Sequence, residues 1–221
     1  DRMAVRGPDA EGIWRGDGAI LGHRRLAILD LDARANQPML SLDGRHSIVF
    51  NGEIYNYREL RNDLLSRGVA FRTTSDTEVL LNLFQLKNEG MLPLLRGMFA
   101  LAIWDNQKKE IFLARDPYGI KPLYYTNARN TFLFSSQVKS LRASGLVTTG
   151  LESAAIVSYY LWGSVCDPWT LYKNVFAVPA GCWLRVRDGR ISNPVLWNDI
   201  KTHWREPAEG RGNAPKIQEA V

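Results

Sequence analysis

The stretch 46–78 contains the residues of this chain with the clearest potential for chemistry. An apolar, strand-like segment runs directly into Asn51, Gly52 and Glu53, and Asp76 opens a later helical segment. A side-chain amide and an unobstructed backbone N–H can stabilise an oxyanion, and two carboxylates can bind an ammonium group. The combination suits an amino acid with a side-chain carbonyl, bound in a pocket where the ends of packed elements converge.

The pair Asn51-Gly52 also has a purely structural interpretation. Asn-Gly between two apolar segments is the strongest short signal for a β-hairpin turn. The following residues argue against a hairpin, because the leucines of segment 57–67 recur at helical spacing. We therefore expect a strand over 47–50 that ends at this pair and leads into a helix.

Ser75 and Glu78 are open to two interpretations as well. Ser-x-x-Glu ahead of an apolar segment is the signature of a capping box, in which the serine accepts a hydrogen bond from a backbone N–H and the glutamate reaches back. A capping box needs no ligand. In the alternative, this helix start presents the carboxylate of Asp76 to the same pocket as Asn51.

Alternating patterns and turn residues predict many antiparallel strands and several helices. The predicted strands cover 11–14, 19–29, 47–50, 98–104, 110–115, 123–126, 131–135, 182–187 and 190–196. The predicted helices cover 57–67, 77–88, 92–96, 138–143 and 153–161. Segment 98–104 is apolar on both faces, so its strand is expected at the centre of a covered sheet. Together these elements predict a layered α+β domain.

Composition argues against several functional classes. No stretch of the 221 residues approaches the ~20 apolar residues of a membrane span. The net charge is +5, but the 28 Lys and Arg are dispersed and not interleaved with aromatic residues, which argues against nucleic-acid binding. Cys166 and Cys182 have no disulfide or metal spacing, and His23, His46 and His203 are too scattered for a metal site. We expect a cytoplasmic protein that binds neither nucleic acid nor membranes.

Seven motifs together resemble a known family, although each alone is weak. They are Arg6-Gly7-Pro8-Asp9, His23 to Asp30, Asn36-Gln37-Pro38-Met39, Asn51 to Asn56, Ser75-Asp76-Thr77-Glu78, Arg96 to Ala100 and Ala114 to Tyr125. In this order they resemble the glutaminase half of glutamine-hydrolysing asparagine synthetase, a class II glutamine amidotransferase, over residues 2 to 197. The resemblance implies the N-terminal-nucleophile hydrolase fold, a four-layer αββα sandwich in which two antiparallel sheets lie between helical layers.

The resemblance also implies roles in binding L-glutamine. The side-chain amide of Asn51 and the N–H of Gly52 are expected to form the oxyanion hole, where a glycine permits close approach. Arg25 is expected to bind the α-carboxylate, because its planar fork can reach both oxygens. Without the surrounding motif, Arg25 would be interpreted as a surface cation of an arginine-rich protein.

The remaining binding roles follow from the same resemblance. Asp76 and Glu53 are expected to bind the α-ammonium, and backbone groups at Ile28 and Leu29 to complete the site. By contrast, Arg115 and Asp116 are interpreted as a packed charge pair, and Tyr124 and Tyr125 as core residues at the end of a strand.

The chain departs from the family at the nucleophile. The family uses an N-terminal cysteine whose own α-amine (pKa ~8, near the thiol's ~8.5) is the base, whereas residue 1 here is Asp1. Cys166 lies in a loop-like segment and Cys182 within a strand, so neither replaces that cysteine. We expect residues 1–197 to be an amidotransferase domain lacking its first strand, 198–215 a linker, and 216–221 the start of a missing synthetase domain.

Three functions remain open at this stage. The first is glutamine hydrolysis that supplies ammonia to a downstream synthetase domain of the same polypeptide, where ATP and Mg would bind, since no Ser-Gly-Gly-x-Asp-Ser loop occurs here. The second is a degenerate, non-catalytic module that binds glutamine or forms a homodimer. The third is an amidotransferase domain that serves another acceptor. The retained Arg25, Asn51, Gly52, Glu53 and Asp76 favour truncation over loss of the cysteine.

Overall fold

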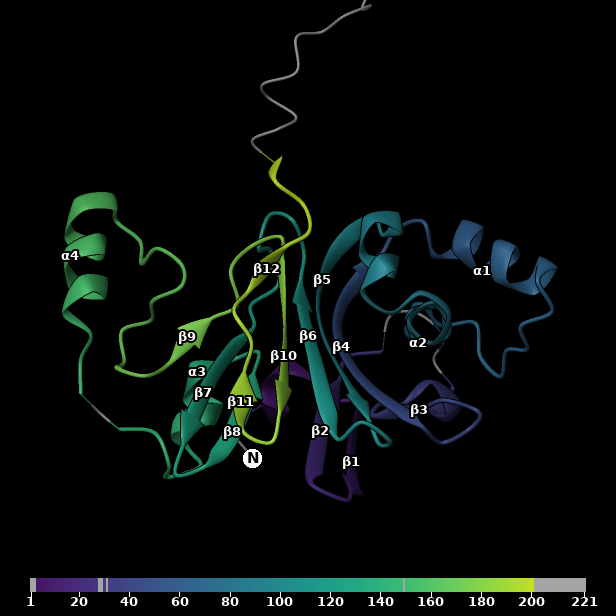
Figure 1. Ribbon diagram of the computed structural model, residues 1–221, viewed down its shortest axis with the longest axis horizontal. Helices are drawn as coiled ribbons and strands as arrows, with labels where there is room; N and C mark the ends of the chain where they lie inside the picture. Colours follow the sequence, from purple (N-terminus) through teal and green to yellow (C-terminus); the bar gives the residue numbers. More distant parts are fainter. Residues whose placement is uncertain (1–2, 28–29, 31, 149, 201–221) are drawn as a thin grey trace, which may run out of the picture.

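A seven-stranded antiparallel sheet forms the centre of the molecule (Figure 1). The computed structural model describes residues 3–27, 30, 32–148 and 150–200. The strand order is β11-β10-β6-β5-β4-β3, with β12 also paired to β10. The strands are β3 (Met39–Leu40), β4 (His46–Ile54), β5 (Gly97–Asp105), β6 (Glu110–Arg115), β10 (Cys182–Arg187), β11 (Arg190–Ile191) and β12 (Val195–Leu196).

The central strand β5 is buried on both faces, as its sequence predicts. Side chains alternate across a strand, so Phe99, Leu101 and Ile103 point into one hydrophobic core. Ala102 and Trp104 belong to a second core on the opposite face. The sheet therefore separates two cores.

Two helices cover the first face. α1 (Tyr57–Ser66) and α2 (Asp76–Lys87) pack over β4 and β5, followed by a 3₁₀ helix over Asn88–Leu94. Nine residues of α2 are buried, including Val79, Leu80 and Phe84. α2 therefore holds the residues of its first turn, Asp76 to Glu78, in a fixed position.

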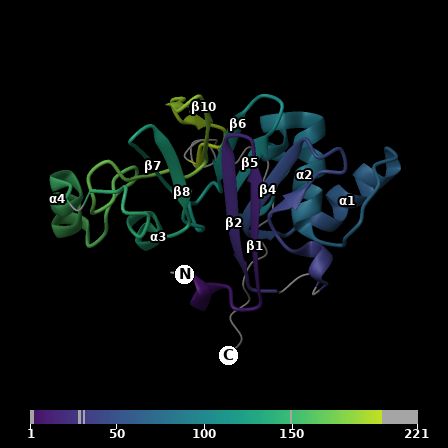
Figure 2. The same cartoon turned by 90° about the horizontal axis from the view of Figure 1, so that it is seen from below.

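The second face is covered by two smaller sheets rather than one. β1 (Ala10–Gly16) pairs with β2 (Ala19–Arg25), and β7 (Tyr124–Ala128) pairs with β8 (Thr131–Ser135) and β9 (Phe176–Ala177). α3 (Val138–Arg142) lies against β7 and β8, and completes a helix–sheet–sheet–helix order. Figure 2 shows β2 and β8 as neighbours on the side of the large sheet away from α1 and α2.

Helix α4 (Ser153–Trp162) stands at the edge of this layered structure (Figure 1). Of its residues only Ala155 and Ser158 are buried. α4 is therefore not packed over a sheet in the way that α1 and α2 are.

Several predicted boundaries need correction. β2 ends at Arg25 instead of continuing to residue 29, and segment 190–196 forms two short strands, β11 and β12. The strands β3 and β9 have two residues each and were not predicted. Tyr124 and Tyr125 begin β7 rather than end a strand, although Tyr125 does lie in the core.

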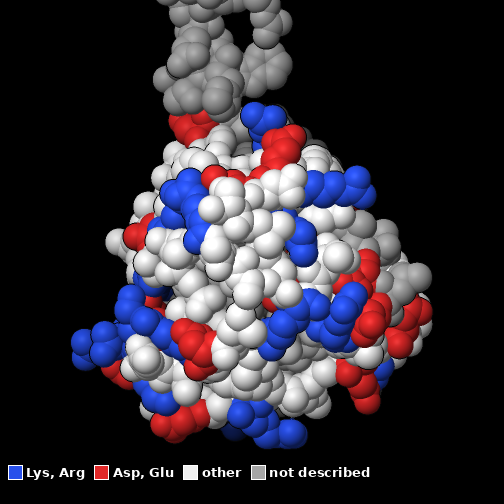
Figure 3. Space-filling model, turned by 90° about the vertical axis from the view of Figure 1, so that its right-hand side faces the viewer, with Lys and Arg blue, Asp and Glu red and all other residues white. Residues whose placement is uncertain are grey.

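The described surface carries charges of both signs. On the face in Figure 3, Lys and Arg are interspersed with Asp and Glu. None of the described helices is long and apolar enough to cross a membrane. The predicted linker and the predicted start of a further domain fall, from residue 201 onward, outside the described residues.

Candidate active site

A cavity of about 550 Å³ lies where β2, β4 and the start of α2 meet. Its lining includes Arg25, Asn51, Gly52, Glu53 and Asp76, so the described residues predicted for the site come together. The other two predicted residues, 28 and 29, lie outside the described residues.

Asn51 and Gly52 lie within β4, which continues to Ile54. Asn51 is opposite Ala100 of β5, and Gly52 is opposite Phe99. The hairpin interpretation is wrong, and so is the expectation that the strand ends at this pair. Asn51 is instead the first exposed residue of β4, after five buried ones.

Gly52 is required by the neighbouring strand. A Cβ atom at this position would lie 2.2 Å from the carbonyl oxygen of Met98 and 2.7 Å from Cα of Phe99. Any larger residue would push β4 away from β5 and would displace Asn51 with it.

Asp76 occupies the first turn of α2 and is 5% exposed. Its carboxylate accepts a hydrogen bond from the N–H of Ile54, at 3.2 Å. Burial raises the pKa of Asp76 to about 6, and the nearby Glu53 acts in the same direction, against the hydrogen bond from Ile54. A cation in the cavity would favour the ionised form.

The capping box at the start of α2 is only half formed. The Ser75 hydroxyl accepts from the N–H of Glu78, at 3.3 Å, as the motif predicts. The Glu78 carboxylate instead accepts from the N–H of Thr73, at 2.6 Å. Glu78 does not line the cavity, so Asp76 is the carboxylate that this helix contributes.

Arg25 is buried at the end of β2, with 8% exposure, so the surface-cation interpretation is wrong. Its guanidinium donates to the side-chain oxygen of Asn36 at 2.7 Å, to the carbonyl of Asp32 at 3.1 Å, and to the carbonyl of Asp30. These bonds fix the orientation of the guanidinium in the cavity wall.

Gln37 belongs to the site and had no predicted role. Its side-chain oxygen accepts from the N–H of Phe50 at 2.6 Å, and its side-chain nitrogen donates to the Thr77 hydroxyl at 3.2 Å. Gln37 thus connects β4 beside Asn51 to α2 beside Asp76. The only signal for it in the sequence was its place in the Asn-Gln-Pro-Met motif.

His23 is a second residue that was not predicted. Its Nε2 lies 3.2 Å from the carbonyl oxygen of Phe50, the residue before Asn51. Burial lowers the pKa of His23 below its ordinary value, so the ring is neutral at pH 7 and Nε2 donates. Its Nδ1 is buried and has no partner among the described residues.

A groove runs from the candidate site between β2 and β8. It consists of two cavities of about 300 and 810 Å³, and Ile20, Leu133 and Phe134 line both. Asn51 lines the first of these cavities as well as the candidate site. Within the described chain, β2 pairs only with β1 and β8 only with β7, so two unpaired strand edges border the groove.

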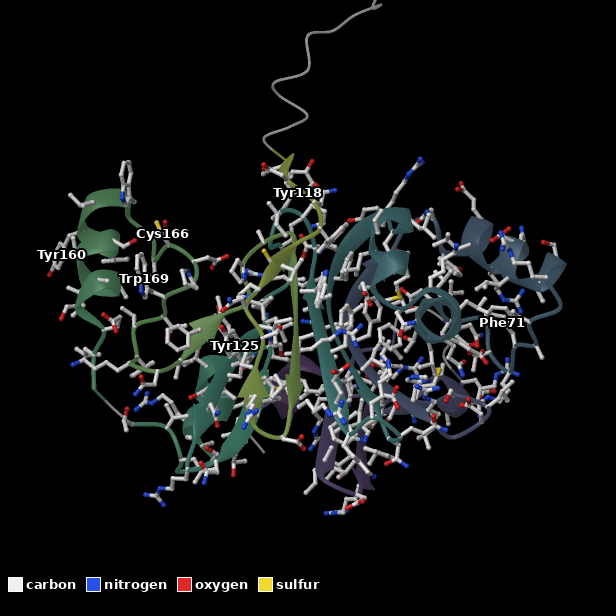
Figure 4. The ribbon with its side chains drawn as sticks, in the orientation of Figure 1. Phe71, Tyr118, Tyr125, Tyr160, Cys166 and Trp169 are labelled. Carbon is white, nitrogen blue, oxygen red and sulfur yellow. The ribbon has the colours of Figure 1, made fainter. Side chains whose placement is uncertain are left out.

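The cavity is not lined by Arg115, Asp116, Cys166 or Cys182. Arg115 is not paired with Asp116 as predicted: its guanidinium bonds Asp167 at 2.9 Å, while Asp116 is fully buried and accepts backbone N–H groups of the next turn. Cys182 is buried, and Cys166 lies beside α4, away from β4 (Figure 4). The described residues contain no group of three or more His, Cys, Asp or Glu arranged to hold a metal.

Comparison with known proteins assigns the chain to a family. The pattern of the glutamine amidotransferase domain family matches residues 1–197. Asparagine synthetases 1 and 3 (glutamine-hydrolysing) of Bacillus subtilis are 40% and 34% identical over 85% and 86% of the chain. A protein of Gibberella zeae named amidase chry2 is 40% identical over 85% of the chain. The chain spans 29%, 31% and 27% of these three relatives.

A solved structure shows the fold. The glutamine phosphoribosylpyrophosphate amidotransferase of B. subtilis, complexed with ADP and GMP, superposes on 81% of this chain and 35% of its own. The TM-score is 0.60 and the identity 21%. The prediction of an α+β sandwich of the N-terminal-nucleophile hydrolase type is confirmed.

Proposed function

Because the chain belongs to the family of glutamine amidotransferase domains, we propose that it binds L-glutamine and is the glutamine-hydrolysing half of an asparagine synthetase-type enzyme. The observation that carries this proposal is the single cavity lined by a fixed arginine, two carboxylates and an exposed amide.

The charged residues of the cavity suit the two ends of an α-amino acid. Arg25 lines the cavity and binds the α-carboxylate. Asp76 and Glu53 bind the α-ammonium, which also compensates their burial. The side-chain amide of glutamine then extends toward Asn51.

Asn51 and Gly52 stabilise the oxyanion that forms during hydrolysis. When a thiolate attacks the side-chain carbonyl carbon, the carbonyl oxygen becomes an oxyanion that accepts hydrogen bonds from the Asn51 amide and the Gly52 N–H. The carbon–nitrogen bond then breaks, the nitrogen takes up a proton and leaves as ammonia, and water hydrolyses the thioester to glutamate.

The groove between β2 and β8 is where the nucleophile enters. An added strand there would pair with both free edges, and its first residue would lie beside Asn51, which borders both groove and cavity. A cysteine at that place would have its own α-amine as base. Cys166 and Cys182 do not line the cavity. Without an added cysteine beside Asn51, the domain would be the non-catalytic glutamine-binding module of the alternative.

The ammonia acceptor belongs to another part of the protein. The relatives named as asparagine synthetases favour transfer to aspartate by an ATP-dependent domain, with ATP and Mg bound there. Amidase chry2 is as similar to this chain as asparagine synthetase 1, so a different acceptor is the second candidate.

The test is Asn51→Ala in the full-length protein. Loss of one preorganised oxyanion donor is expected to lower kcat for glutamine hydrolysis by about 10²–10³. Amide synthesis from added ammonia should be unchanged, because it bypasses the carbonyl chemistry. Asn62→Ala, on the exposed face of α1, is the control. If both activities fall together in Asn51→Ala, the residue is structural and the proposal fails.

A further inference from the structure

The largest unexplained surface feature is α4, which lies far from the cavity and takes no part in the proposed reaction. The segment between Glu152 and Asp167 contains no charged residue. The exposed apolar side chains of the helix are between 56% and 84% exposed: Val157, Tyr159, Tyr160, Leu161 and Trp162.

α4 is nevertheless a well-formed helix. The Glu152 side chain caps its start by accepting from the N–H of Ala154 at 3.2 Å, and Gly163 ends it in the left-handed conformation with φ of 70°. The Ser158 hydroxyl accepts from the N–H of Cys166 at 3.0 Å, which folds the following loop against one side. The opposite side has no cover within the described chain.

A helix that is apolar nearly all round is normally buried. An exposed apolar patch of this kind marks an interface, and the absence of charge is typical of a permanent partner rather than a transient one. Figure 4 shows Tyr160 on the outer side of α4, with Trp169 on the neighbouring loop. Trp169 is 40% exposed and lies on the inner side of α4, so the helix alone forms the outward-facing apolar surface.

We propose that this surface, formed by the exposed residues from Val157 to Trp162, docks the synthetase domain of the same polypeptide. The inference rests on the proposed function. The matched asparagine synthetases are about three times as long as the stretch that this chain covers. A domain attached after residue 200 is a permanent partner, and its tether keeps it close at high effective concentration.

The position of the last described residues also favours the synthetase domain as the partner of this surface. α4, the exposed Tyr118 and the last described residues lie along one edge of the molecule (Figures 1 and 4). Tyr118 is 69% exposed and Leu196 is 55% exposed. A globular domain of roughly 400 residues has a radius of gyration of about 21 Å, so one domain can cover both this end of the chain and α4.

Photo-crosslinking in the full-length protein tests the proposal. Tyr160 is replaced by p-benzoylphenylalanine, the dilute protein is irradiated, and the cross-linked peptides are identified by mass spectrometry. Leu86, which is 55% exposed on α2, receives the same replacement as the control. We expect Tyr160 to cross-link within one polypeptide to residues beyond 221, and Leu86 not to do so.

Two results would overturn the proposal. Cross-links between two polypeptides, together with a dimeric mass by light scattering, would assign the surface to a second copy. Absence of any cross-link beyond residue 221, repeated with the replacement at Leu161, would show that α4 remains uncovered. Glutamine hydrolysis by the unmodified full-length protein is measured separately, so failure of the docking inference is distinguishable from failure of the proposed function.

Discussion

At the scale of single residues, the site separates opposite charges onto different elements. Arg25 comes from the end of β2, Glu53 from β4 and Asp76 from α2, and all three line one cavity. Arg25 and Asp76 are both largely buried, so their charges interact with a ligand more strongly than surface charges would. On the proposed function, recognition of an α-amino acid depends on the chemistry of each of these groups.

Arg25→Lys in the full-length protein should weaken glutamine binding. Lysine carries the charge but cannot reproduce the fork or its bonds to Asn36 and Asp32. We expect KM for glutamine to rise by about tenfold, and kcat to change less, because the lost interaction is made in the ground state as well. Arg58→Lys, on the exposed side of α1, is the control. An unchanged KM would show that Arg25 does not bind the glutamine α-carboxylate.

Asp76 should make glutamine binding pH-dependent. Its pKa is raised to about 6, so in the empty site the carboxylate takes up a proton as the pH falls through 6. Only the ionised form pairs with the α-ammonium, so KM should be flat above pH 7 and rise by up to about tenfold per pH unit below 6. Steady-state kinetics from pH 5 to 8 measure this, and the same dependence in Asp76→Asn would contradict the assignment.

At the scale of elements, one buried side chain couples the strand and the helix that build the site. Gln37 bonds the backbone of Phe50 in β4 and the hydroxyl of Thr77 in α2. Movement of either element would displace Asn51 or Asp76 relative to the other. The relative position of Asn51 and Asp76 therefore depends on the hydrogen bonds of Gln37.

Gln37→Leu should destabilise the protein. The substitution keeps the approximate volume but leaves the N–H of Phe50 buried without its acceptor, which costs about 1–3 kcal/mol. A denaturant titration of the domain that includes the added first strand should show a lower midpoint with an unchanged slope. Gln85→Leu, whose side chain makes an exposed bond to Asp43, is the control. Equal midpoints for the two variants would show that Gln37 has no special structural role.

At the scale of the whole molecule, the second layer is divided by the groove between β2 and β8. Trp104 Nε1 and His23 Nδ1 both line this region and have no partner among the described residues. Buried polar atoms without partners and two free strand edges are costly features that an added strand would relieve. The groove is thus the place where stability and catalysis are expected to depend on the same segment.

Residues 1–221 alone should release no glutamate from glutamine above a buffer control, and should unfold without a sharp transition. Adding the upstream segment that carries the expected N-terminal cysteine should restore both a cooperative transition and hydrolysis. Replacing that cysteine by alanine should keep the transition and abolish hydrolysis. Turnover of glutamine by residues 1–221 would refute the N-terminal-nucleophile assignment.

The sequence by itself determined most element types and the chemical inventory of the site. The spacing of leucines in α1, the serine cap of α2 and the two-sided apolar pattern of β5 are local signals, and local backbone preferences express them directly. Asn51, Gly52 and Asp76 were identified because their residue types stand beside such signals.

Only the tertiary structure decided how these pieces meet. The continuation of β4 through Asn51 depends on its pairing with β5, and the burial of Arg25 depends on the loop around Asn36. The roles of Gln37 and the exposure of α4 likewise come from contacts, or missing contacts, between residues distant in sequence. Such contacts leave no local periodicity, because the free energy that selects them arises when separate elements pack together.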